Sequence, residues 1–308
     1  MSRYPESVRG ILLFLSSQAR LRRWMETSAI ARRLSSRFVA GETLAEALAV
    51  AKSMNAAGIS VTLDHLGENV TSLAEAAASR DEYIRALEEI RAAGLHANVS
   101  IKLTQFGIDI DEEACCEYVA TLVSVAARHE NFVRVDMESS AYTDRTLRLV
   151  TELHARCGAA GAVIQSYLYR SEQDLELLSR QGIRIRLCKG AYLEPPTVAY
   201  EHKADVDRNY IHLMKKLLES GTYPALATHD EAIIAETEQF VAARQIPVSK
   251  FEFQMLYGIR RDLQKRLVSD GYQVRVYIPY GKAWYPYFMR RLAERPANVL
   301  FLIRNLMR

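Results

Sequence analysis

The feature of this sequence that most constrains its fold is an alternation of short apolar runs and helical stretches that starts after Gly58. Eight runs rich in β-branched residues predict strands at residues 59–63, 97–103, 132–137, 162–167, 183–188, 225–228, 251–255 and 274–278. Helical spacing predicts helices between them at residues 71–93, 112–129, 143–157, 171–180, 204–220, 231–243 and 258–269. Because no Gly/Ser-rich linker interrupts this pattern, we predict an α/β fold, a (βα)8 barrel of TIM type over residues 58–308.

An open, doubly wound sheet is the alternative for the same alternation. It is less favoured because neither GxGxxG nor GxxxxGK[ST] follows any predicted strand. Ahead of the barrel, the pattern predicts helix over residues 4–48, with arginines among apolar positions. We therefore expect an N-terminal helical arm over residues 1–57 that packs on the barrel, with docking to a membrane surface or a partner as the alternative.

Charge and composition exclude several classes of protein. The 40 basic and 37 acidic residues are mixed along the chain, so a net charge of +3 does not indicate a nucleic-acid partner. The longest apolar runs, residues 11–15 and 299–303, are too short to span a bilayer, and residues 1–23 lack a signal-peptide layout. The four cysteines show no CxxC spacing. A soluble protein of the reducing cytoplasm, without a zinc site, is expected.

Polar side chains gather where the predicted strands end. Since the sites of such barrels lie at the carboxyl ends of the strands, we expect these side chains at one mouth. They are Asp64, His65, Glu68, Lys102, Asp136, Glu138, Gln165, Arg186, Lys189, Tyr192, Thr228, His229, Asp230, Glu252, Gln254 and Tyr277. Buried charges cost several kcal/mol unless they are paired or bound to a ligand, so charged residues inside three of these runs favour a ligand site.

Residues 273–296 combine a strand, a turn and a helix that carries two adjacent arginines. The alternating strand is expected to break at Pro279, and helical spacing starts at Trp284. One face of this helix carries Tyr287, Arg290, Arg291 and Glu294. Two interpretations remain open: a solvated face with an ion pair between Arg290 and Glu294, or a clamp in which both guanidinium groups bind a carboxylate.

The predicted mouth carries more positive charge than a neutral ligand needs, from Lys102, Arg186, Lys189, Arg290 and Arg291. We therefore expect a carboxylate substrate, with a phosphorylated cofactor near the late strands. His229 is interpreted as a hydrogen-bonding residue rather than a metal ligand, because the other histidines are scattered. Neither a GxSxG motif nor a Cys-His constellation indicates a covalent nucleophile.

Eight segments in order resemble those of the proline dehydrogenase family: LDHLGE, SIKLT, VRVDMES, VIQSYLYR, RIRLCKGAY, ATHD, FEFQMLYG and YIPYGKAWYPYFMRRLAERP. The resemblance covers residues 58–307, and the last segment, with its Arg-Arg-Leu-x-Glu core, is highly specific. It implies a distorted (βα)8 barrel that uses FAD to oxidise L-proline to 1-pyrroline-5-carboxylate. Composition and periodicity by themselves do not indicate a flavin.

The same resemblance implies roles for the substrate-site residues. The proline carboxylate would be held by Lys102, Arg290 and Arg291. Asp136 would support Lys102 from behind, and Glu294 would brace the two arginines. The pyrrolidine ring would pack on Leu256, Tyr277 and Tyr287. Because Tyr277 is large, L-proline is expected to be preferred over trans-4-hydroxy-L-proline.

Cofactor and partners are also implied by the resemblance. FAD would contact Gln165, Arg186, Lys189, Gly190, Ala191, Tyr192, Thr228 and His229, and Glu68 would pair with Arg186 when the site closes. Electrons would pass to a membrane quinone through peripheral contact with the inner face of the cell membrane. The basic N-terminal region or Leu300, Phe301 and Ile303 would make this contact, although core packing is the favoured role for these three residues. A separate pyrroline-5-carboxylate dehydrogenase would take the product. The rivals are a non-catalytic barrel that senses an anionic metabolite and another flavin barrel, such as a folate reductase.

Overall fold

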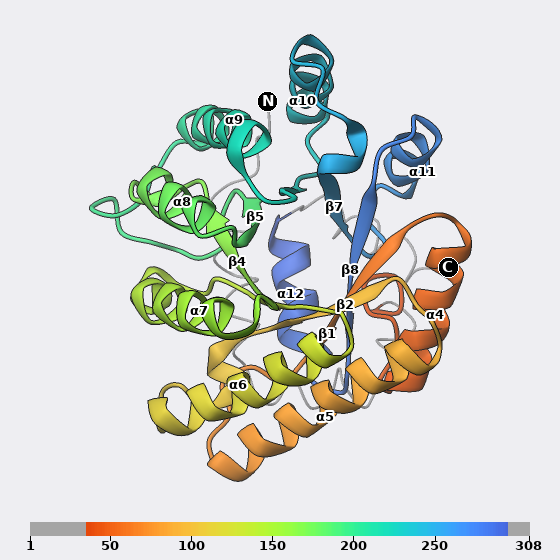
Figure 1. Ribbon diagram of the computed structural model, residues 1–308, viewed down its shortest axis with the longest axis vertical. Coiled ribbons are helices and arrows are strands. Elements are labelled where there is room, and N and C mark those ends of the chain that lie inside the picture. Colours follow the sequence, from red (N-terminus) through yellow and green to blue (C-terminus); the bar gives the residue numbers. More distant parts are fainter. Residues whose placement is uncertain (1–34, 295–308) are drawn as a thin grey trace, which may run out of the picture.

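The computed structural model describes residues 35–294, and of residues 290–294 it describes the helical backbone only. Eight parallel strands form a closed barrel, in which each strand pairs with the next along the chain and β8 pairs with β1. Helices surround this barrel (Figure 1). The predicted (βα)8 barrel is confirmed, and the doubly wound sheet is wrong. None of the described helices is long and apolar enough to cross a membrane.

The elements follow the predicted order. The strands are β1 (Ser60–His65), β2 (Ala97–Ile101), β3 (Val133–Val135), β4 (Ala160–Gln165), β5 (Arg184–Cys188), β6 (Ala225–Ala227), β7 (Glu252–Leu256) and β8 (Val274–Tyr280). The helices are α4 (Leu44–Ala56), α5 (Leu73–Ala92), α6 (Glu112–Arg128), α7 (Thr143–Cys157), α8 (Ser171–Arg180), α9 (Lys203–Ser220), α10 (Glu231–Ala243), α11 (Arg261–Ser269) and α12 (Trp284–Glu294). Side chains that accept a backbone N–H cap the starts of four of them: Thr43, Ser72, Asp111 and Asp230.

The N-terminal helix prediction is wrong at its C-terminal end. Turns and bends occupy residues 36–43, and α4 begins at Leu44 after a capping box formed by Thr43 and Glu46. Residues 1–34 lie outside the described part of the chain. Leu44 and Ala47 of α4 belong to the main hydrophobic core. The described part of the predicted arm therefore packs on the barrel.

The predicted end of the last strand is also wrong, because β8 continues through Pro279 to Tyr280. Proline lacks the N–H that a central strand needs. Here β7 pairs with β8 only as far as Tyr277, so no β7 residue lies opposite the ring nitrogen. The carbonyl oxygen of Pro279 still accepts a hydrogen bond from Ala40 N–H at 2.9 Å. The strand can therefore run through the proline without losing a ladder bond.

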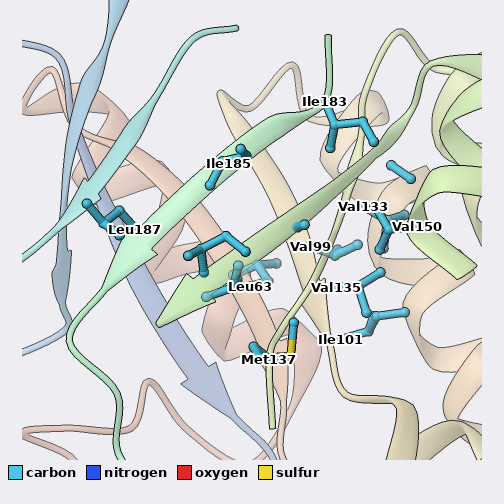
Figure 2. Packing of buried hydrophobic residues seen from close by; sticks show 14 of the residues in the cluster. Leu63, Val99, Ile101, Val133, Val135, Met137, Val150, Ile183, Ile185 and Leu187 are labelled. Atoms are coloured by element: carbon cyan, nitrogen blue, oxygen red, sulfur yellow. The ribbon is translucent and has the colours of Figure 1, made fainter. Parts of the chain in front are cut away.

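Apolar residues that alternate along the strands pack outward against the helices. Figure 2 shows this core around Leu63 of β1, Val99 and Ile101 of β2, and Val133 and Val135 of β3, with Val150 of α7 beside them. All six are fully buried. The period of two that predicts the strands also places the intervening residues inside the barrel.

Many of these interior residues are polar or charged, unlike the bulky aliphatic side chains that usually fill a TIM barrel. Hydrogen bonds join strands that are not neighbours: Arg186 of β5 donates to Ser100 of β2 at 3.3 Å, and Arg275 of β8 donates to Asn98 of β2 at 3.1 Å. Such contacts cross the inside of the barrel. Buried charges need partners, so the interior forms a network of ion pairs and hydrogen bonds that leads up to the carboxyl ends of the strands.

Candidate active site

A cavity of about 740 Å³ opens at the carboxyl ends of the strands, a volume typical of ligand pockets. All eight strands contribute to its lining, most of them through residues at or directly after their ends, together with the segments that follow β5 and β6. Tyr287 of α12 forms part of its wall. In Figure 1, α12 lies over the middle of the ring of strands, which agrees with a helix that covers this mouth.

Lys102, Asp136 and Tyr277 lie together in the cavity wall. Nζ of Lys102 is 3.6 Å from Oδ2 of Asp136 and 3.5 Å from the hydroxyl oxygen of Tyr277. That hydroxyl donates a 2.8 Å hydrogen bond to Asp136. Burial acts to lower the pKa of Lys102, but the carboxylates of Asp64 and Asp136 raise it above its usual value. A buried ammonium group is therefore held charged beside the cavity, with Asp136 next to it.

Arg186 reaches from β5 toward the same cluster. Its Nη1 donates to Oδ1 of Asp136 at 2.7 Å, and its Nε donates to Oε1 of Gln254 at 2.5 Å. The guanidinium lies 5.2 Å from the centre of the Tyr277 ring. Among the described residues, Nη2 of Arg186 and Oε1 of Gln165 are buried without a hydrogen-bond partner. Both side chains line the cavity, so these atoms can serve a ligand.

Two aspartates of the cavity have opposite electrostatic environments. Burial acts to raise the pKa of Asp136, but Arg186 and Lys102 outweigh it and lower the pKa below its ordinary value. Burial raises the pKa of Asp64, and Lys102, 3.5 Å away, offsets only part of that effect. Asp136 is thus a fixed anion, whereas Asp64 binds a proton more readily.

The residues predicted to bind the cofactor all line this cavity: Gln165, Arg186, Lys189, Gly190, Ala191, Tyr192, Thr228 and His229. Lys189 already pairs with Asp230 at 2.9 Å and Asp207 at 2.5 Å. Gly190 has a φ of +114°, and a Cβ there would lie 2.4 Å from the Tyr167 ring, so the backbone at this point requires glycine.

His229 follows β6, and its imidazole contributes to the structure of the cavity wall. Its Nε2 accepts a hydrogen bond from the backbone N–H of Leu256 at 3.0 Å. This agrees with the interpretation of His229 as a hydrogen-bonding residue. Leu256, the last residue of β7, lines the cavity. Its packing on the substrate ring stays a prediction.

Glu68 lies in a small hollow beside the main cavity, which it shares with Asp64 and Lys102. The predicted pair between Glu68 and Arg186 is not formed in this structure, where Arg186 pairs with Asp136 instead. That pair stays a prediction for the ligand-bound state. The side chains of Arg290, Arg291 and Glu294 lie outside the described part of the chain, so the carboxylate clamp also stays a prediction.

The sequence places Asp64 and Gln254 at the predicted mouth without an individual role and does not single out Ser100, yet each of the three contacts a predicted site residue. Ser100 donates to Asp136 at 2.6 Å, and Gln254 accepts from Arg186. The signal that could have indicated the roles of Ser100 and Gln254 is the two-residue period of the strands. Ser100 precedes Lys102 by two residues and Gln254 precedes Leu256 by two, so each pair shares a face.

The fold and the site together define a class of protein: a (βα)8 barrel whose cavity at the carboxyl ends of the strands is bordered by buried, charged lysine and arginine side chains. Comparison with known proteins identifies the family within that class. The sequence profile of the proline dehydrogenases matches residues 47–304. This chain belongs to the proline dehydrogenase family.

Individual relatives agree with this assignment. Proline dehydrogenase 1 of Bacillus subtilis is 41% identical over 98% of this chain and 99% of its own length. Proline dehydrogenase of Deinococcus radiodurans is 44% identical over 89% of this chain and 90% of its own. A crystal structure of proline utilization A from Bdellovibrio bacteriovorus, inactivated by N-propargylglycine, matches 92% of this chain and 38% of its own with a TM-score of 0.81. At 24% identity this last likeness supports the fold alone.

Proposed function

We propose that this protein is a flavin-dependent enzyme that oxidises L-proline to 1-pyrroline-5-carboxylate and passes the electrons to a quinone. The observation that carries the proposal is the buried ammonium of Lys102, held charged in the wall of a cavity at the carboxyl ends of the strands. Family membership supports proline as the substrate, because its carboxylate is the group such a cation would bind.

The residues of the cavity fit a flavin. Its ring system presents hydrogen-bond donors and acceptors along one edge, and the cavity wall offers a donor on Arg186 and an acceptor on Gln165 that no described residue engages. Gly190 and Ala191 would border the cofactor, and Thr228 and His229 would face it from the segment after β6. When bound, FAD would supply the acceptor for the hydride. Arg186 would stabilise negative charge that develops on that acceptor.

The chain's own residues would bind and orient the substrate. Lys102, with the predicted Arg290 and Arg291, would fix the carboxylate, while Tyr277, Tyr287 and Leu256 would hold the ring. Such positioning can account for a large part of the rate enhancement of an enzyme. Closure by Glu68 against Arg186 would exclude water from the reacting carbon.

We further propose that the electrons leave to a quinone at the inner face of the cell membrane and that a separate pyrroline-5-carboxylate dehydrogenase takes the product. The test is to incubate the purified protein with L-proline and either a water-soluble quinone or NAD+, and to quantify 1-pyrroline-5-carboxylate by mass spectrometry. Product with the quinone alone is expected. Product formed only with NAD+ would contradict the quinone as electron acceptor. If no product forms but the protein binds an anion tightly, a sensor would be favoured over an enzyme.

A further inference from the structure

One carboxylate oxygen in the cavity wall is left unused by the fold. Asp64, near the end of β1, is only 1% exposed and lines both the main cavity and the small hollow. Its Oδ1 accepts from the hydroxyl of Tyr83 at 3.3 Å and lies 3.5 Å from Nζ of Lys102. Its Oδ2 has no hydrogen-bond partner among residues 35–289 or the backbone of residues 290–294. A buried acceptor without a donor is costly, so its presence calls for an explanation.

Asp136 shows how a carboxylate with a supporting role is held in the same site. Arg186 and Ser100 donate to its Oδ1, and Tyr277 donates to its Oδ2. Tyr277 also faces Asp64, but its single hydroxyl proton is donated to Asp136 at 2.8 Å. When two neighbouring carboxyl groups have pKa values shifted in opposite directions, the one with the raised pKa is suited to proton transfer.

The other carboxylates that line the main cavity are already engaged. Asp230 pairs with Lys189 at 2.9 Å, and Glu231 pairs with Arg260 at 2.5 Å. Glu68 lines the adjoining hollow but not the main cavity. Among the described carboxylates of the cavity, Asp64 therefore combines burial with an oxygen available to a ligand.

We infer that Asp64 accepts, through Oδ2, the proton that the substrate amine must lose. The inference rests on the proposed function, because proline carries an ammonium group beside its carboxylate. One N–H bond of this ammonium breaks, its proton moves to Asp64, and its electron pair stays on nitrogen. The adjacent C–H bond then breaks, its two electrons leave with the hydrogen as hydride to the bound flavin, and the nitrogen pair forms the C=N bond.

Several charged and titratable groups of the described residues interact with Asp64. They are Lys102, His65, Glu68, Tyr83, Asp136, Tyr277 and Tyr280. Lys102 favours the ionised carboxylate, whereas burial and the two nearby acids favour the protonated form and raise the pKa. Since a proton acceptor works when deprotonated, the rate of flavin reduction should rise as the pH increases through the pKa of Asp64.

The test measures the rate at which L-proline reduces the flavin, without oxygen and across a range of pH, in wild type and in Asp64→Asn. The rate should fall by roughly 10²- to 10⁴-fold in the variant, and the wild-type rise with pH should disappear. Tetrahydrofuran-2-carboxylate, which has the ring and carboxylate but no amine, should bind the variant at least as tightly, because an anion beside Lys102 is gone. Formate should restore part of the rate in Asp64→Ala by filling the gap with a small carboxylate.

The controls separate the alternatives. Asp81→Asn removes the same charge from an exposed position of α5 and should leave the rate unchanged. A wild-type rate of flavin reduction in Asp64→Asn overturns the inference. So does an affinity for the analogue that falls as much as the rate, because Asp64 would then only position Lys102. If Asp64→Asn and Asp64→Ala both fail to bind flavin, the wild type alone decides: a rate of flavin reduction that is constant from about pH 5 to 9 overturns the inference. If L-proline does not reduce the flavin of the wild-type protein, the proposed function is refuted instead.

Discussion

At the scale of single residues, the proposed site combines cations that would bind a carboxylate with Tyr277, which would limit the space above the ring. Lys102 is held by Asp64, Asp136 and Tyr277, whose oxygen atoms lie 3.5–3.6 Å from its Nζ, longer than a strong ion pair or hydrogen bond. This spacing leaves the ammonium free to bind a ligand more closely. The roles of Lys102 and Tyr277 can be tested separately.

Lys102→Ala should lower kcat/KM for L-proline by roughly ten- to hundredfold, because it removes one charge-assisted contact to the carboxylate. Arg291→Met should have an effect of similar size if the predicted clamp exists. Both variants should still bind FAD, as judged by the flavin spectrum. Lys52→Ala, an exposed lysine of α4, is the matched control. A wild-type kcat/KM in either variant would show that the clamp is misassigned.

Tyr277→Ser should narrow the preference for L-proline over trans-4-hydroxy-L-proline, because it opens space over the ring. The steric conflict in wild type is expected to be worth about 1–3 kcal/mol. The Tyr277 hydroxyl also donates to Asp136, so Tyr277→Phe serves as a control that removes this bond and keeps the ring. The ratio of kcat/KM for the two substrates should change in the serine variant only. An unchanged ratio there would mean that another residue selects the substrate.

At the scale of elements, the segment between β5 and α9 is fastened to the segment after β3. Oε1 of Glu194 accepts from the backbone N–H of Ser140 at 2.7 Å and from Tyr167 at 3.4 Å, and Oε2 accepts from the Ser140 hydroxyl at 2.5 Å. The fastened segment carries Gly190 and Ala191 of the cavity wall. Glu194 therefore holds in place the part of the wall proposed to border the cofactor.

Glu194→Gln should weaken FAD binding by about tenfold, because the loss of charge weakens these hydrogen bonds. Equilibrium dialysis of FAD from the purified protein measures this change. Glu201→Gln, an exposed position of the same segment, should bind FAD like wild type. Equal FAD affinity in wild type and Glu194→Gln would contradict a role for this attachment.

The sequence predicts the elements well where their periodicity is strong. All eight strands and the helices between them are found, and α12 begins at Trp284 as expected. The continuation of β8 through Pro279 could not be predicted, because it depends on where the neighbouring β7 ends. The buried Asp64 oxygen without a hydrogen-bond partner could not be predicted either, because it depends on which partners Asp136 takes from three other strands.

At the scale of the whole molecule, the ionic interior of the barrel links fold stability to the site. Glu252, 2% exposed, accepts from Arg275 at 2.9 Å and from Gln254, which in turn accepts from Arg186. Burial acts to raise the pKa of Glu252, but Arg275 and these hydrogen bonds lower it overall. The pair thus stabilises the fold at neutral pH and supports the residue that faces the proposed flavin.

Glu252→Gln should lower the free energy of unfolding by about 3–5 kcal/mol at pH 7, because it leaves Arg275 buried without its anion. The pKa of Glu252 is lower in the folded than in the unfolded chain. Its stabilising effect is therefore present above the pKa of the unfolded chain, about 4.3, and is lost as the pH falls through the pKa of the folded chain. Urea unfolding at several pH values should show the difference between variant and wild type shrinking below about pH 4. A difference independent of pH would contradict this account.

The flavin absorbance of the purified protein shows whether this barrel holds a flavin that L-proline reduces. The absorbance spectrum of the purified protein is recorded without oxygen, before and after addition of L-proline. We predict a flavin band that L-proline bleaches, while D-proline, with its carboxylate on the opposite side of the ring, leaves it largely unchanged. A protein that has no flavin band, even after incubation with FAD, or a band that L-proline does not bleach, would contradict the account.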